Sequence, residues 1–565
     1  MDLRKYPPVR RVVRIDMPSR ILARVLTAFA ALLIAAPAVA YDASRAPRYA
    51  SPDMYRPNVD RIVVNGTGST GPIETMSATA TGASAGQTLG GWFSSIVLGT
   101  PTVTSLRAYS RFFISPDTLI TVGGYTSLGD GGGGTFRWSN TSTATDDGVL
   151  TINPTGNGGA GRWLRIFNGT LPIEAAGGIC NGGADDTAAF RRAVAALAAL
   201  GRGGIIAIGP KACIVSGTID GAANVFFRGN GRESTAILTN VPTGDVFRFG
   251  TAAASYNSFG MSDLLVGSTV TRTSGALIAI SGSRGTFRSI GLRGGYDGIT
   301  IDNYGNQAIV AIYDLLAENM GNECISLGKF STAPALFANG LHLTASTLAQ
   351  CQTSMALYAA SGVYVQDVES YQSKGHAFAF IPTTSHLGIQ GAWFNQTLAD
   401  SPTANGWFFA GTGKISEVKL TASQASSAGG HGIDIEPGTN LDSLLITDFQ
   451  STFNAQHGLR IGGGYNVTVR GGEFYYNGNG SGGVGIAVEN NVKGFTIQGI
   501  NGGYGGWAKV NNLTMKQTNC IYVVGPTNDN YIVTGNRCMG NTATNDQIHD
   551  GGTGANKIVE KNLSY

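Results

Sequence analysis

Two short stretches place a histidine just ahead of a run that carries another charged side chain. GGHGIDI contains His431 and Asp434 and is followed by Glu436, and QHGLRI contains His457, 26 residues after His431, and Arg460. A carboxylic acid beside an ionised carboxylate can supply the acid and the base that cleave a glycosidic bond. A histidine can orient such an acid, and an arginine can hold a substrate carboxylate. We call these five residues the Asp434 cluster and predict that they are catalytic.

A second candidate pair has the same spacing. Asp297 in DGITI and Glu323 in ECISL are 26 residues apart, and Asp302 and Lys329 lie just beyond the two runs. If the runs are neighbours, the two carboxylates lie about 5 Å apart, and their repulsion raises the pKa of one of them. This pair, the Asp297 cluster, is also suited to a glycosidic bond. We favour the Asp434 cluster, because it carries charges of both signs and two histidines.

The elements that position these residues are short strands that repeat. A five-residue frame with small or apolar residues at its second, third and fifth positions recurs about every 27 residues. Two or three short strands per unit, with no helix between them, are typical of a parallel β-solenoid. The frames begin at residues 245, 276, 297, 323, 355, 376, 405, 431, 457, 484, 519 and 546.

Each frame predicts which side chains face outward. The third and fifth residues are expected to point into the solenoid and the fourth to point out of it, whereas the first lies at a corner. The fourth residues include Tyr358, Phe408, Asp434 and Arg460, and the first residues include Asp297, Glu323, His376, His431 and His457. Two interpretations of the corner histidines stay open: catalysis, or hydrogen bonding to corner backbone with stacking on the next coil.

The segment DDTAAFRRAVAALAALGRGG, residues 185–204, predicts a helix. Asp185 or Asp186 caps its start, apolar residues recur at helical spacing from Phe190 to Leu197, and Gly201 ends it. Because the open end of a solenoid invites strand addition, we expect this helix to cover the N-terminal opening.

Residues 1–40 predict a signal peptide. Arg10, Arg11, Arg14, Arg20 and Arg24 precede the apolar run Val25 to Ala36, and Ala38-Val39-Ala40 has the small-x-small form of a cleavage site. The apolar run is too short to span a bilayer comfortably. We therefore expect cleavage after Ala40 and a secreted, periplasmic or cell-surface protein. Residues 1–40 carry a net charge of +5, so their removal lowers the formal charge from +3 to −2 and leaves no electrostatic case for binding nucleic acid.

The six cysteines of an exported chain can form disulfides. Sequence order suggests Cys180 with Cys213, Cys324 with Cys351 and Cys520 with Cys538, which is one of the fifteen pairings that six cysteines allow. None shows a CxxC spacing, which argues against zinc or a redox dithiol.

The predicted helix belongs to a longer stretch that resembles a known family. GGADDTAAFRRAVAALAALGRGGIIAIGPKACIVSGTI is similar to the first segment of the pectate-lyase-like right-handed β-helix proteins. The resemblance is close over residues 174 to about 240, and the later coils agree in pattern only. It implies an all-β protein with a right-handed parallel β-helix over residues 174–565.

The preceding residues resemble a different module. GGYTSLGDGGGGTFRWSNTSTATDDG and GRWLRI, within residues 106–173, are similar to the small segment ahead of the β-helix in phage tailspikes. Residues 41–105, rich in Ser, Thr, Ala and Gly, are a leader of unknown structure. If the tailspike resemblance extends to assembly, the protein is a homotrimer.

The polygalacturonase family of β-helix glycosidases offers a narrower resemblance to both clusters. Its successive coils carry NTDG, DDC, GHG and RIK. Asp297 matches the end of NTDG, Glu323 the second Asp of DDC, His431 the GHG histidine, and Arg460 the Arg of RIK. Here Glu323 and His431 are four frames apart, roughly 19 Å, which is too far for one reacting bond. The resemblance therefore splits between the two clusters.

This resemblance implies a polysaccharide as the binding partner, and we expect a glycoside hydrolase. A lyase that acts by β-elimination is an alternative, for which calcium is a candidate cofactor; otherwise we expect no cofactor or metal. A non-catalytic glycan-binding or adhesion β-helix is the rival from another class. Tyr358, Phe408, His376 and Tyr475 are candidates for binding sugar rings.

Overall fold

A computed structural model describes residues 58–59, 80–81, 98–109, 114–251, 256–302, 309–330, 337–480, 482–503, 505, 513–543 and 546–564. The chain divides into two units, residues 1–98 and 99–565. In the first, β1 (Asn58–Val59) pairs with β2 (Ala80–Thr81) in antiparallel fashion. The expected signal peptide and most of the expected leader lie outside the described residues. Within the described ranges, no helix is long and apolar enough to cross a membrane.

A small sheet opens the second unit. Its order is β3 (Leu98–Thr100), β4 (Leu119–Val122), β5 (Gly134–Ser139), β7 (Arg162–Arg165) and β6 (Thr151–Ile152), with α3 (Val103–Arg107) after β3. Burial alternates along β4 and β5, as expected for strands with one face on a core. Trp138 and Trp163 meet there edge to face, 5.1 Å apart. The sheet begins at Leu98, before residue 106 where we placed its start.

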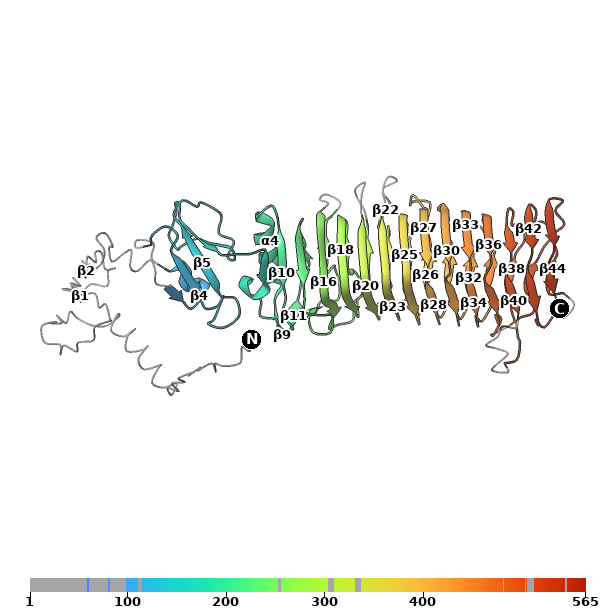
Figure 1. Ribbon diagram of the computed structural model, residues 1–565, viewed down its shortest axis with the longest axis horizontal. Helices are drawn as coiled ribbons and strands as arrows, with labels where there is room; N and C mark the ends of the chain where they lie inside the picture. Colours follow the sequence, from blue (N-terminus) through green and yellow to red (C-terminus); the bar gives the residue numbers. More distant parts are fainter. Residues whose placement is uncertain are drawn as a thin grey trace, which may run out of the picture. The chain divides into compact units, whose positions relative to one another are not determined.

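The expected right-handed parallel β-helix follows, as Figure 1 shows. The repeating frames form one parallel sheet of 13 strands. These strands are β12 (Ile219–Asp220), β15 (Phe247–Phe249), β17 (Ala276–Ile280), β19 (Asp297–Ile301), β21 (Glu323–Leu327), β24 (Thr353–Leu357), β26 (Phe378–Phe380), β29 (Trp407–Phe409), β32 (Ile433–Ile435), β35 (Leu459–Ile461), β38 (Ile486–Val488), β41 (Ile521–Val523) and β44 (Ile548–Asp550).

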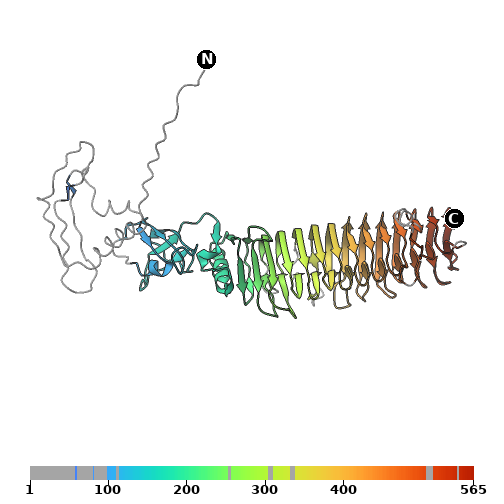
Figure 2. The same ribbon diagram turned by 90° about the horizontal axis from the view of Figure 1, so that it is seen from below.

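The other runs of each coil form a second sheet of 26 strands, which Figure 2 shows from another side. Its strands are β8 (Thr170–Pro172), β9 (Asn181–Asp185), β10 (Gly204–Ala207), β11 (Ala212–Val215), β13 (Val225–Arg228), β14 (Ala236–Thr239), β16 (Asn257–Ser268), β18 (Ser283–Arg293), β20 (Val310–Glu318), β22 (Ala338–Asn339), β23 (Leu341–Ala349), β25 (Ala360–Tyr371), β27 (Ile389–Asn395), β28 (Leu398–Asp400), β30 (Ile415–Thr421), β31 (Gln424–Ser426), β33 (Leu441–Thr447), β34 (Gln450–Thr452), β36 (Tyr465–Arg470), β37 (Glu473–Tyr475), β39 (Thr496–Gln498), β40 (Asn501–Gly503), β42 (Tyr531–Thr534), β43 (Arg537–Met539), β45 (Lys557–Glu560) and β46 (Leu563–Ser564).

From β16 onward, the second sheet bends once in each coil through a residue with a left-handed backbone. The bend residues are Asp263, Ser289, Asp314, Ala345, Asp367, Gln396, Ala422, Asp448, Gly471, Gly499, Gly535 and Lys561, all with positive φ. Only three of these twelve residues are Gly, and none is Asn. The coils above and below fix the backbone of each bend, so the fold tolerates side chains that a free turn would disfavour.

Replacing Ala422 by Gly should stabilise the β-helix by about 1 kcal/mol, because Gly adopts a left-handed backbone without a Cβ clash. Ala422 has φ +46°. Chemical denaturation would measure the change in the free energy of unfolding. Ala425→Gly, in the buried strand β31, is the matched control and should lower stability. A destabilised Ala422→Gly variant would contradict this account of the bend.

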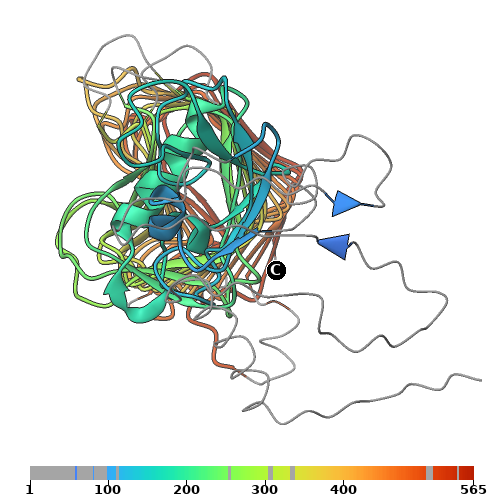
Figure 3. The same ribbon diagram turned by 90° about the vertical axis from the view of Figure 1, so that its left-hand side faces the viewer.

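The predicted helix forms α4 (Thr187–Ala199) and packs at the first coils, as Figure 3 shows. Asp185 performs the predicted capping role, because its carboxylate accepts a hydrogen bond from the backbone N–H of Thr187 at 2.9 Å. Phe190 and Leu197 are fully buried in the core that runs through the coils. The 3-10 helix η3 (Ile173–Ala176) precedes β9 and contacts α4.

The register confirms the outward position in eleven of the twelve frames and corrects one. Ser326 pairs with Ala356, so the frame on β24 begins at Thr353 and not at Met355. Tyr358, predicted to face outward on this strand, instead follows its last residue. Since side chains alternate with a period of two, a frame displaced by two residues keeps the same apolar pattern. The sequence frames also missed β12, the first strand of the sheet.

Candidate functional site

The Asp297 cluster lies on β19 and β21, which are neighbours in the 13-stranded sheet. Lys329 extends its ammonium between the two carboxylates, 3.0 Å from Oδ1 of Asp297 and 2.9 Å from Oε2 of Glu323. The amide of Asn322 donates to Asp297 at 2.8 Å, and the hydroxyl of Tyr358 donates to Glu323. The structure thus brings the predicted pair together, but it fills the space between them with a cation.

The Asp297 cluster is closed to solvent. Asp297 and Glu323 are 2% and 4% exposed, and Asp302 beside them is also buried. Burial raises the pKa of Asp302 to about 6, although its carboxylate accepts a hydrogen bond from the backbone N–H of Phe330. With each carboxylate held by donors from the protein, the cluster has the features of a buried ion pair that fixes two coils together.

The corner histidines form a ladder between coils. Nδ1 of His431 accepts from the backbone N–H of His457 at 3.1 Å, and Nδ1 of His457 accepts from that of Val484 at 3.1 Å. Asn405 Oδ1 accepts from the N–H of His431 at 2.8 Å in the same way. The rings of His431 and His457 also stack, 5.1 Å apart. Of the two interpretations left open by the sequence, these contacts support hydrogen bonding to corner backbone.

Burial keeps these histidines neutral. It lowers the pKa of His376 to about 4, that of His431 to about 3 and that of His457 to about 4. The unfolded chain takes up protons on these rings below about pH 6.5, so their contribution to stability is lost as the pH falls through the range from 6.5 to 4. Asp434 and Asp302, whose pKa burial raises to about 6, offset part of this loss.

Replacing His457 by Asn should therefore reduce the loss of stability between pH 7 and pH 4 by about 1 kcal/mol or more. Asn keeps an acceptor for the N–H of Val484, as Asn405 already does for His431. Unfolding free energies at the two pH values would measure the difference. His342→Asn, at an exposed position on β23, is the control and should leave the loss of stability between the two pH values unchanged. If His457→Asn and the original protein lose the same unfolding free energy between pH 7 and pH 4, the histidine ladder is not the source of that loss.

The Asp434 cluster lies on β32 and β35, where Asp434 pairs with Arg460 across the two strands. Nε of Arg460 is 2.6 Å from Oδ1 of Asp434, and its Nη2 is 2.7 Å from Oε1 of Glu436. The amide of Asn405 donates to the other oxygen of Asp434 at 2.8 Å. One guanidinium therefore holds two carboxylates side by side on the outer face.

The two carboxylates of this cluster have different surroundings. Asp434 is 2% exposed, and burial raises its pKa to about 6 in spite of the opposing Arg460 charge. The side chain of Glu436 is 40% exposed. Two neighbouring carboxyl groups, one buried with a raised pKa and one in contact with water, are the arrangement that acid and base catalysis requires.

Two residues that contact this cluster were missing from the sequence prediction. Glu489 lies 3.7 Å from Nη1 of Arg460, and Asn405 binds Asp434. The frame pattern contained the signal for Glu489, since it follows the frame on β38 as Glu436 follows the frame on β32. With Glu489, three carboxylates surround Arg460, so this arginine is not free to hold a substrate carboxylate as we suggested.

The predicted sugar-binding residues do not form one exposed surface. The rings of His376 and Phe408 stack on each other, 3.9 Å apart, and so each covers one face of the other. Tyr358 is half-buried at the Asp297 cluster. Tyr475 is half-buried at the end of β37, which belongs to the 26-stranded sheet rather than the sheet that carries both clusters.

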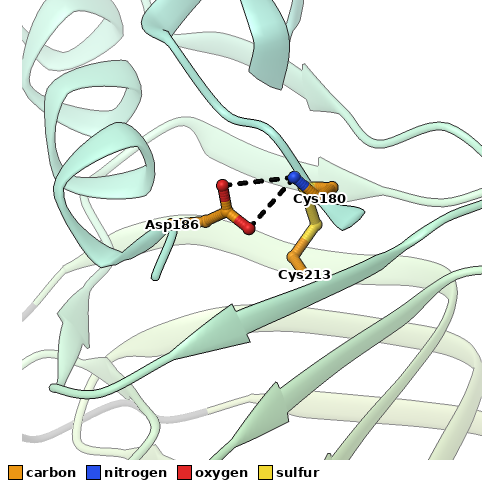
Figure 4. A group of neighbouring side chains, drawn as sticks. All are labelled: Cys180, Asp186 and Cys213. Carbon is orange, nitrogen blue, oxygen red and sulfur yellow. Dashed lines mark hydrogen bonds between the residues drawn. A yellow bond between two sulfur atoms is a disulfide. The ribbon is translucent and has the colours of Figure 1, made fainter. Parts of the chain in front are cut away.

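Cys180, Asp186 and Cys213 are the one group of potential metal ligands in the part of the chain that the structure describes. Figure 4 shows that the two sulfurs are bonded to each other and that the carboxylate of Asp186 faces the backbone N–H of Cys180. This group is therefore a disulfide beside a hydrogen-bonded carboxylate and not a metal site. All three suggested disulfides are confirmed, since Cys324 is bonded to Cys351 and Cys520 to Cys538.

Comparison with known proteins gives one family match and several similar folds. Residues 99–168 match the family described as "Phage tail protein small four-stranded beta-sheet domain". No curated protein sequence matches the chain.

Three solved structures have a similar fold. The tailspike protein gp49 of Acinetobacter baumannii bacteriophage Fri1, a capsular polysaccharide depolymerase, is 14% identical over 82% of this chain and 75% of that one, with a TM-score of 0.46. The pre-mature gene product 12 of bacteriophage phi29 is 11% identical over 70% and 56%, with a TM-score of 0.49. Tailspike protein 2 of Escherichia coli O157:H7 bacteriophage CAB120 is 13% identical over 79% and 52%, with a TM-score of 0.41.

The chain thus carries, at residues 99–168, a match to the small β-sheet domain of phage tail proteins, followed by a right-handed parallel β-helix.

Proposed function

We propose that this protein is a glycoside hydrolase that cleaves a polysaccharide at the Asp434 cluster. The observation that carries the proposal is the pair of carboxyl groups on one guanidinium, with Asp434 buried and Glu436 open to water. Asp434 donates the proton that the leaving oxygen needs, and Glu436 acts as the carboxylate that activates water or attacks the sugar. Arg460 holds both groups in place. A polysaccharide is also the substrate class in the name of the gp49 tailspike.

The charge of the cluster favours hydrolysis over β-elimination. A lyase that acts on a uronic acid has to neutralise the substrate carboxylate. Here the carboxylates of Asp434, Glu436 and Glu489 surround one arginine, so the surface presents an excess of negative charge. Such a surface repels an acidic sugar and accepts a neutral one.

The Asp434 cluster is a better candidate than the Asp297 cluster because one of its two carboxylates, that of Glu436, is open to solvent. Lys329 occupies the space between Asp297 and Glu323, and both carboxylates are buried. To reach these carboxylates, the glycosidic oxygen of a substrate would have to displace the Lys329 ammonium, which both carboxylates hold. Glu436, by contrast, presents 40% of its side chain to solvent.

A degradation screen of the full chain against neutral and acidic polysaccharides tests the proposal. New reducing ends are measured together with the ultraviolet absorbance of unsaturated uronic ends. Reducing ends without that absorbance, absent from the Glu436→Gln variant, are the expected result. Reducing ends with the absorbance would mean a lyase, and neither signal across the panel would favour a glycan-binding protein. Reducing ends that persist in Glu436→Gln would place the site elsewhere.

We also propose that the protein is exported and trimeric. Residues 1–40 support export, through their arginines, apolar run and Ala38-Val39-Ala40 sequence. The match of residues 99–168 to a phage tail domain supports the trimer only by analogy with tailspikes. An N-terminal sequence of the exported protein that does not begin at Tyr41 would contradict cleavage after Ala40. A monomeric mass in light scattering would contradict the trimer.

A further inference from the structure

A cavity of about 610 Å³ lies over three successive turns of the β-helix. The described residues that line it include Ser427, Phe453, Tyr476, Asn479 and Leu513, and none of the described lining residues is charged. The volume is in the range of small-molecule sites. The cavity thus joins aromatic rings to a few neutral polar groups.

The two aromatic residues of this cavity stand where the fold otherwise uses polar residues or glycine, as at Gly294 after β18 and Gly540 after β43. The residue that directly follows β20, β23, β25, β28 and β31 has a positive φ in each case; these residues are Asn319, Gln350, Gln372, Ser401 and Ser427. Phe453 after β34 and Tyr476 after β37 have the same conformation, with φ +60° and +53°. A bulky aromatic side chain is rare in the left-handed region, where Asn or Gly costs less strain. Backbone strain at a position where Asn or Gly would be less strained suggests that the side chain has a function.

The rings of these residues contact each other; Phe453 is half-buried, whereas Tyr476 is only 5% exposed. The rings lie 4.9 Å apart and are tilted by 47°, and the hydroxyl of Tyr476 donates to the carbonyl of Thr514 at 2.5 Å. An aromatic face of this kind packs against the apolar C–H face of a sugar ring. Ser427 and Asn479 add neutral hydrogen-bonding groups to the cavity wall.

The position of the cavity connects it to the Asp434 cluster. Its lining includes Gly429 and Ala455, which lie two residues before His431 and His457. The same turns lead directly into β32 and β35, the strands that carry Asp434 and Arg460. A chain of sugars that reaches the cluster can therefore extend over these turns.

We infer that this cavity is a subsite that stacks one uncharged sugar ring of the polysaccharide on Phe453, which packs against the buried ring of Tyr476. The inference rests on the proposed function and names the class of sugar that it takes. Lack of charge in the described lining and the excess of carboxylates around Arg460 both select against a uronic acid.

The test uses the full chain with Glu436→Gln, so that a bound glycan is not cleaved. Fluorescently labelled neutral hexasaccharides of glucose, galactose, mannose and xylose are compared with hexagalacturonate and hexaguluronate by fluorescence anisotropy. Phe453→Asn removes the ring and inserts a residue that accepts φ +60°. Binding of at least one neutral hexasaccharide should weaken about tenfold or more in this variant, with no loss of folding stability.

Two further variants complete the comparison. Ser401→Asn changes the equivalent turn residue two coils before Phe453 and should leave binding unchanged. Tyr476→Phe keeps the ring without the bond to Thr514 and should also retain binding. The inference is overturned if no neutral hexasaccharide binds, if only the acidic ones bind, or if Phe453→Asn binds as well as its parent.

The same data separate this inference from the proposed function. Glu436-dependent cleavage with no effect of Phe453→Asn would leave the hydrolase standing and remove the subsite. Phe453-dependent binding of a neutral hexasaccharide by a protein that cleaves no polysaccharide would support the subsite and refute the hydrolase.

Discussion

Asp434→Asn should lower kcat about a thousandfold, because the amide cannot donate the proton that the leaving oxygen requires. The amide oxygen still accepts from Arg460, which lies 2.6 Å from Asp434 in the present structure, but the new NH2 group faces the donating amide of Asn405. Circular dichroism should therefore resemble that of the original protein, and thermal unfolding should show the cost of this one lost hydrogen bond. Initial rates of reducing-end release would measure the change.

A matched control for this substitution is Glu489→Gln. Glu489 contacts the same arginine at 3.7 Å, a longer contact, and its side chain is 35% exposed. We expect less than about a threefold change in kcat for this variant, as for other exposed ion pairs. A fully active Asp434→Asn variant would refute the assignment of Asp434 as proton donor.

The pH dependence should identify the same group. Burial raises the pKa of Asp434 to about 6, so the protonated form that donates is lost above that pH. The kcat/KM of the original protein should fall about tenfold per pH unit above pH 6. Glu489→Gln should retain this limb of the profile, and a flat profile from pH 5 to pH 8 would contradict the role of Asp434.

Lys329→Met should lower the free energy of unfolding by about 3–5 kcal/mol, because it leaves Asp297 and Glu323 buried without their counter-ion. The side chain of Lys329 is 18% exposed, and its ammonium lies within 3.0 Å of both carboxylates. Chemical denaturation at pH 7 would measure the loss. The effect should exceed that of any exposed ion pair, such as Arg137 with Asp117.

A triple variant shows whether the unpaired charges cause this loss. Asp297→Asn, Glu323→Gln and Lys329→Met together remove the charges and nearly keep the volume, and most of the stability should return. Glu323→Gln should leave kcat within about threefold, because the Asp297 cluster has no catalytic role in the proposed function. Loss of turnover without loss of fold in Glu323→Gln would transfer the active site to that cluster.

Local patterns determined much of this protein. The alternation of apolar residues in the frames fixed the parallel β-helix and placed Asp434 opposite Arg460, because only one face of each strand can enter the core. The helical spacing from Phe190 to Leu197 fixed α4. Sequence order was enough for the disulfides, because cysteines close in sequence lie on the same or adjacent coils. For the corner histidines the sequence allowed either catalysis or hydrogen bonding to corner backbone, and the contacts between coils support the second.

Other features depended on contacts between coils and between strands and turns. The frame on β24 was displaced by two residues, because a period of two cannot distinguish such a shift and only pairing with β21 decides it. This pairing places Tyr358 beyond its strand, where its hydroxyl reaches Glu323. The frame pattern places Asp434 on the outer face and Asp297 at a corner, but it does not show what covers them. Lys329 from beyond one strand and Arg460 from the next strand supply that cover, and they make one carboxylate pair a buried ion cluster and leave Glu436 of the other open to water.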